Sequence, residues 1–64
     1  MDKISIVTIK CYDGMYFNVT EKFYFRLEKD AKIFLSEKGF FEKENCIFEK
    51  DDYYTAKIEF VKLN

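Results

Sequence analysis

The sequence predicts an α+β fold of order β-β-α-β-β, in which a four-stranded antiparallel sheet carries one helix packed on one face. Three observations lead to this prediction: stretches with a period of two, an Asp-Gly pair between the first two of them, and one stretch with helical spacing. A chain of 64 residues has room for one domain, so we expect residues 1–64 to form a single small α+β domain.

The N-terminal half has the pattern of a β-hairpin. Residues 3–11 are rich in β-branched side chains, and residues 15–27 alternate, with apolar side chains at every odd position except Glu21. Asp13-Gly14 lies between the two segments and is a strong signal for a tight turn. Glu21 is a charged residue within this apolar stripe. We favour the interpretation that it marks a strand edge or a bulge, and the alternative is a functional site.

Two registers of this hairpin are possible. A two-residue loop would place Lys10 opposite Phe17. A three-residue loop, with glycine in the left-handed conformation, pairs Ile9 with Phe17 and Val7 with Val19. The second register matches apolar side chains with apolar partners, so we predict that all four of these apolar residues face the core.

In residues 27–38 the spacing becomes helical. Leu27, Ala31, Phe34 and Leu35 form an apolar stripe, and Lys38 follows on the same side of the predicted helix. Gly39 follows directly and can end the helix in the left-handed region. A helix of about three turns is too short to be stable alone in water, so it must lie on the sheet.

The C-terminal part predicts a second hairpin. Residues 45–49 form the first strand, residues 50–52 the turn and residues 53–63 a long alternating strand. Residues 42–45 are a second candidate for a turn, which makes this hairpin less well defined than the first. We expect the long C-terminal strand to lie beside the first strand, because both are apolar enough to be central.

Composition argues against catalysis. The chain contains no histidine, and Ser5 and Ser36 have no partner base, so we predict no catalytic residue and no enzyme activity. Acidic residues are frequent between positions 42 and 52, but their spacing fits no calcium loop and is more typical of a solvated turn. We therefore predict no metal site and no cofactor.

The net charge and the two cysteines indicate which partners and which cellular compartment to expect. Eleven basic and twelve acidic side chains give a formal net charge of −1, which argues against electrostatic binding to nucleic acid or to an anionic membrane. Cys11 and Cys46 lack metal-type spacing, so we favour buried free thiols over a disulfide. Residues 1–10 alternate rather than form an apolar run, so we expect no signal peptide or membrane span, and a cytoplasmic protein.

The predicted sheet face away from the helix is the most informative functional feature. Tyrosines and β-branched residues with sparse charge are typical of an interaction surface. The alternative interpretation is an ordinary half-exposed sheet. Our candidate partner-binding residues on this face and at the loops beside it are Ile4, Ile6, Tyr12, Tyr16, Lys22, Tyr24 and Tyr53.

These features predict a non-catalytic protein-binding module, an inhibitor or modulator of a larger protein, docking through the open sheet face or an edge strand. Size and composition are those of small proteins of low-GC bacteria and their phages or prophages, and so small a chain suggests a homodimer. One alternative is single-stranded nucleic-acid binding through the sheet tyrosines, although a positive groove is lacking. Another is a homo-oligomer that binds a small ligand.

Overall fold

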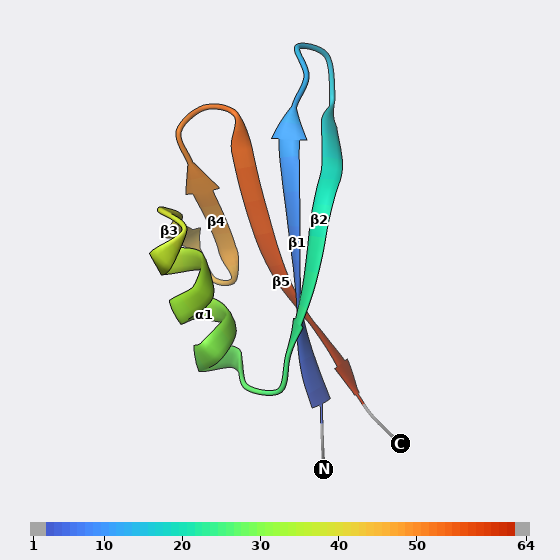
Figure 1. The fold of residues 1–64 in the computed structure, drawn as a ribbon, viewed down its shortest axis with the longest axis vertical. Coiled ribbons are helices and arrows are strands. Elements are labelled where there is room, and N and C mark those ends of the chain that lie inside the picture. Colours follow the sequence, from blue (N-terminus) through green and yellow to red (C-terminus); the bar gives the residue numbers. More distant parts are fainter. Residues whose placement is uncertain (1–2, 63–64) are drawn as a thin grey trace.

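The computed structural model describes residues 3–62, which form one helix and a five-stranded antiparallel sheet (Figure 1). The strand order is β2-β1-β5-β4-β3, so the long C-terminal strand lies beside the first, as expected. The α+β class is confirmed, and the number of strands is corrected from four to five. The elements are β1 (Lys3–Tyr12), β2 (Phe17–Phe25), α1 (Glu28–Glu37), β3 (Phe41–Glu44), β4 (Ile47–Lys50) and β5 (Tyr54–Lys62).

The additional strand is β3, an edge strand that pairs with β4. Its sequence is Phe-Glu-Lys-Glu and all four residues are exposed, so it has no buried side and no apolar alternation. The segment predicted as one strand from residue 45 therefore begins with a turn between β3 and β4, in which Cys46 adopts a φ of 64°. Charged side chains suit this position, because they discourage pairing of a free edge with other chains.

The core lies between α1 and one face of the sheet. Ala31 and Leu35 are fully buried, and the ring of Phe34 packs on Phe23 and Phe25 at centroid distances of 4.6 and 5.1 Å. The predicted helical stripe is thus confirmed at its centre, whereas Leu27 is exposed at the helix start. The buried apolar residues are Val7, Ile9, Ala31, Leu35, Phe40, Phe48, Ala56 and Ile58.

The C-terminus of α1 ends in a Schellman motif. The backbone N–H of Phe40 donates to the carbonyl oxygen of Leu35 (2.9 Å), and that of Gly39 donates to Ser36 (3.0 Å). Gly39 has a φ of 95°, as its position after the helix predicted. The motif satisfies helix carbonyl groups and turns Phe40 back into the core beside Leu35.

We expect Gly39→Ala to lower the free energy of unfolding by about 1–2 kcal/mol, because a Cβ disfavours this backbone conformation. Urea denaturation measures this loss as a lower midpoint concentration, with the dependence of the unfolding free energy on urea unchanged. Gly39→Asn should lose less, since asparagine tolerates left-handed conformations better. An unchanged midpoint for Gly39→Ala would contradict the positive φ.

The β1–β2 hairpin differs from the predicted register. Tyr12 pairs with Phe17 and Lys10 with Val19, so a four-residue loop replaces the expected three-residue loop. Opposed residues of an antiparallel pair point to the same side, so Val19 shares the side of Lys10 and not that of Val7. The prediction that Phe17 and Val19 face the core is therefore wrong.

A β-bulge restores the predicted phase farther along β2. Ile9 pairs with Glu21 while Lys10 pairs with Val19, which leaves Thr20 as the extra residue. The Thr20 hydroxyl donates to the carbonyl oxygen of Ile9 (3.2 Å). Beyond the bulge, Phe23 and Phe25 face the helix as predicted, because Phe23 pairs with the buried Val7.

The carboxylate of Asp13 sets the longer loop. Its Oδ1 accepts hydrogen bonds from the backbone N–H groups of Met15 and Tyr16, both at 2.9 Å, and its Oδ2 accepts one from the Asn18 side chain at 2.7 Å. These bonds, with the Tyr16 N–H first, hold the pKa of Asp13 below its ordinary value of 3.8. An Asx-type turn of this kind competes with the tight hairpin that Asp13-Gly14 predicted.

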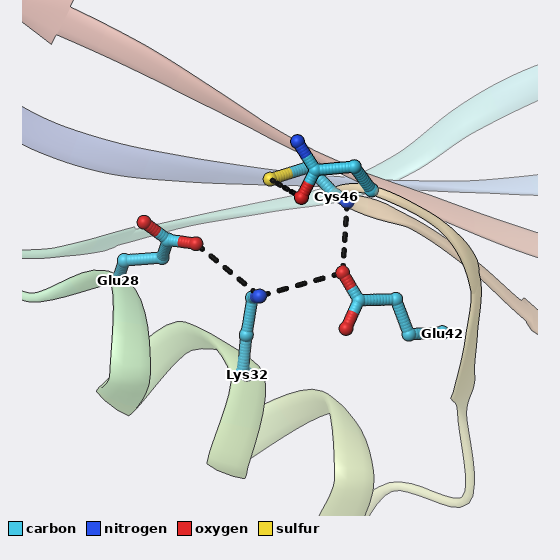
Figure 2. A network of polar contacts seen from close by, with 5 residues as sticks. Glu28, Lys32, Glu42 and Cys46 are labelled. Carbon is cyan, nitrogen blue, oxygen red and sulfur yellow. Dashed lines mark hydrogen bonds and ion pairs between the residues drawn. The ribbon is translucent and has the colours of Figure 1, made fainter.

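A polar network fastens α1 to the β3–β4 hairpin (Figure 2). The Lys32 ammonium lies 3.3 Å from Glu28 and 3.4 Å from Glu42, and Glu42 also accepts the backbone N–H of Cys46 at 2.9 Å. The Cys46 N–H, with Lys32 contributing less, lowers the pKa of Glu42 from its ordinary value of 4.5. One carboxylate thus joins the helix to the tight turn at Cys46.

A carboxyl group with a lowered pKa stabilises the fold above its unfolded-state pKa and loses that contribution as pH falls through its folded-state pKa. Glu42→Gln should therefore be less stable than the wild type at neutral pH, and the difference should shrink below pH about 4.5. Urea midpoints at a series of pH values measure it. Glu37→Gln is the charge-matched control, because Glu37 is exposed and lies outside this network. A loss of stability in Glu42→Gln that does not change with pH would contradict the network.

Candidate interaction surface

The side of the sheet away from α1, which we call the outer face, has no helix over it in Figure 1. Cross-strand pairs assign its residues, because Thr8 pairs with both Lys22 and Lys57 and all three point away from the core. The outer face comprises Ile4, Ile6, Thr8, Lys10, Tyr12, Phe17, Val19, Lys22, Tyr24, Phe41, Glu44, Ile47, Glu49, Thr55, Lys57, Glu59 and Val61.

Apolar side chains occupy both ends of the outer face. Ile4 and Ile6 lie between Tyr24 and Val61 at the end near the chain termini, and both flanking residues are exposed. At the hairpin end, the rings of Tyr12 and Phe17 lie 5.0 Å apart, and Val19 follows on the same side. Such apolar exposure is large for a chain of this size and is typical of a contact surface.

The middle of the outer face is polar, with three lysines beside Glu49 and Glu59. Lys22, Thr8 and Lys57 form a row across three strands, with Lys10 in the adjacent row. Lys57 lies 3.8 Å from Glu59, whereas Lys10 and Lys22 form no ion pair with any residue between 3 and 62. A shallow concavity of about 290 Å³ lies here, lined by Thr8, Lys10, Ile47, Thr55, Ala56, Lys57 and Glu59.

The structure places the sequence-predicted site residues in two groups. On the outer face itself lie Ile4, Ile6, Tyr12, Lys22 and Tyr24. Tyr16 and Tyr53 lie in the β1–β2 and β4–β5 loops, so the predictions that they are strand residues are wrong. Tyr12, predicted in the hairpin loop, instead ends β1. The Tyr12 N–H donates to the Tyr53 carbonyl oxygen (2.8 Å), which brings these loops to the same end of the sheet.

Sequence reasoning missed five apolar members of the outer face. Phe17 and Val19 were hidden by the bulge at Thr20, which the uninterrupted alternation of β2 does not reveal. Val61 was detectable, because it continues the outward phase of Thr55, Lys57 and Glu59. The remaining two, Phe41 and Ile47, lie on the short strands β3 and β4, where alternation is too brief to assign a side.

Reactive and metal-binding chemistry is sparse in the described part of the chain. Cys11 and Cys46 are both free and half-buried, so they are less enclosed than the sequence predicted. The neighbouring Cys11 thiol raises the pKa of the Tyr54 phenol above its ordinary value of 10.0. Within residues 3–62, no three His, Cys, Asp or Glu side chains lie close enough together to hold a metal ion.

Comparisons with protein families, characterised proteins and solved structures find no match to this chain. Among residues 3–62, no helix has the length and apolar character needed to cross a membrane. The candidate site therefore stands on the geometry of the outer face.

Two valines test the register directly. Val7 is fully buried and Val19 is 53% exposed, although the alternation of the sequence assigns both to the core. We expect Val7→Ser to lower the free energy of unfolding by about 3 kcal/mol, through a lost core contact and a buried hydroxyl. Val19→Ser should change it by less than about 0.5 kcal/mol, as for other exposed positions. Equal losses in urea denaturation would contradict the bulge.

Proposed function

We propose that this chain is a non-catalytic protein-binding module, of inhibitor or modulator type, that docks its outer face on a larger protein. The observation that carries the proposal is the pair of exposed apolar clusters at the two ends of that face, with lysines between them. Tyrosine and aliphatic side chains at the centre of an interface commonly contribute most of its binding energy.

Docking by the face is favoured over docking by an edge strand. β2 is a free edge, but Glu21 and Lys22 lie near its middle and the bulge at Thr20 interrupts its ladder. Charged residues and bulges are the features by which natural sheets prevent pairing at an edge. At the opposite edge, three of the four residues of β3 are charged.

The charge of the outer face favours a different protein over a second copy. In a symmetric dimer with its two-fold axis through the central band, Lys10 and Lys22, which have no ionic partner among residues 3–62, would meet their own copies. Like charges opposed in an interface are costly. We therefore propose a partner whose surface has acidic groups between two apolar patches, and a monomer before docking.

Single-stranded nucleic acid is the second candidate, favoured by the lysines that lie beside Tyr24 and the Tyr12–Phe17 pair. Bases could stack on these rings while phosphates meet the ammonium groups. The balance of eleven basic and twelve acidic side chains makes this the weaker proposal. Binding to an oligonucleotide would fall steeply with salt, whereas apolar docking on a protein would fall far less.

Affinity capture with paired variants tests the proposed function. Tyr24→Ser with Val61→Ser removes two exposed apolar groups from the outer face, and we expect the captured protein to fall at least about tenfold, since each such anchor contributes more than about 1 kcal/mol. Ile33→Ser is the matched control, because Ile33 is 52% exposed on α1 and lies off the outer face.

Quantitative mass spectrometry of proteins retained from a lysate of the native host measures the effect. A partner retained by the wild type and Ile33→Ser, but lost from the double variant, supports docking by the outer face. A partner retained equally by all three would contradict it, as would capture of nucleic acid alone.

A further inference from the structure

A second concave site lies on the helix side of the sheet, beyond the C-terminus of α1. It measures about 400 Å³, within the range of about 300–1,000 Å³ common for small-molecule sites. The β1–β2 and β4–β5 hairpins extend beyond the last turn of α1 (Figure 1). Five segments of the chain contribute its lining residues, which are Ile9, Glu21, Lys38, Phe40, Lys50 and Tyr54.

The lining combines an apolar base with charged groups. Ile9 and Phe40 are 3% and 6% exposed and belong to the core. Tyr54 adds an aromatic ring and a neutral phenol. The exposed lining is more polar than apolar, which favours a ligand with a charged group over a purely apolar one.

Aromatic rings position the two lysines of this pocket. The Lys50 ammonium lies 6.0 Å from the ring centroid of Phe40 and 5.8 Å from that of Tyr54. The Lys38 ammonium lies 5.2 Å from the Phe34 ring and 5.8 Å from the Phe23 ring. Cation–π contacts of this kind restrict a side chain without neutralising it.

The two ammonium groups have no ionic partner in the described chain. Neither Lys38 nor Lys50 forms an ion pair with any carboxylate of residues 3–62, and Glu21 forms none either. The pocket therefore has two positive charges and one negative charge, a net charge of +1. Glu21 lines it because the bulge at Thr20 turns this residue to the same side as Ile9.

We infer that this pocket binds a small organic oxyanion, a carboxylate or phosphate attached to an apolar body. Lys38 and Lys50 hold the anionic group through charge-assisted hydrogen bonds. The apolar body rests on Ile9, Phe40 and the Tyr54 ring. Glu21 selects for a donor group on the ligand and against a second, closely placed anion.

Titration with phenyl phosphate and benzoate, followed by ¹H–¹⁵N NMR of the full chain, tests the inference. Phenol is the neutral control with the same ring. We expect saturable shifts for at least one anion, largest at the amides of the six lining residues, with a Kd of about 1 mM or tighter. The two anions separate a phosphate site from a carboxylate site, and phenol should bind far more weakly.

Lys38→Gln and Lys50→Gln should each weaken binding about tenfold, the loss of one charge-assisted contact worth about 1.4 kcal/mol. Lys29→Gln is the charge-matched control, because Lys29 lies on α1 but does not line the pocket. Shifts that rise linearly without saturation, or that are equal in all three variants, would overturn the inference. Such a failure would leave the proposed function standing, because the outer face lies on the opposite side of the sheet.

Discussion

The packing of α1 on one side of the sheet is the contact on which the rest of the fold depends. Leu35 and Ala31 are fully buried against the sheet residues Val7, Ile9 and Ile58. Neither a helix of ten residues nor an isolated hairpin is stable in water, so each element owes its stability to this shared core. The Schellman motif at Gly39 and the Lys32–Glu42 network fix the two flanks of the helix, at its C-terminus and at the β3–β4 hairpin.

The helix is short and the sheet is long, and this mismatch creates both proposed sites. The described chain extends 40 Å along its longest axis, whereas ten helical residues span about 15 Å. α1 therefore covers part of one side, and the pocket at Lys38 and Lys50 opens where it ends. No element of residues 3–62 covers the outer face, where Tyr24 and Val61 are exposed to solvent.

Local patterns predicted the parts of the fold in which one side of an element is buried. The alternation of Tyr54, Ala56, Ile58 and Phe60, for instance, identified the core side of β5, and the stripe ending at Leu35 identified the helix. Where neither side is buried, alternation carries no information on facing, as β3 shows.

The hairpin tip illustrates the same limit. Phe17 and Val19 have core-type side chains in phase with Phe23, and nothing in their order reveals that Asp13 lengthens the loop or that Thr20 adds a residue. Ile4, Ile6, Lys22 and Tyr24 nevertheless lie on the outer face, because the facing of β1 and of β2 beyond the bulge was predicted correctly. Tyr12 lies there because β1 continues through a position predicted as loop.

The central claim is that Val19 and Tyr24 share an open surface while Val7 lies beneath the helix. Paramagnetic relaxation by a soluble gadolinium chelate measures this directly, because relaxation falls steeply with distance from solvent. We expect strong broadening of the Val19 methyl and Tyr24 ring signals and little broadening of the Val7 methyl signals. Protection of Val19 to the same degree as Val7 would contradict the bulge and, with it, the outer face as a docking surface.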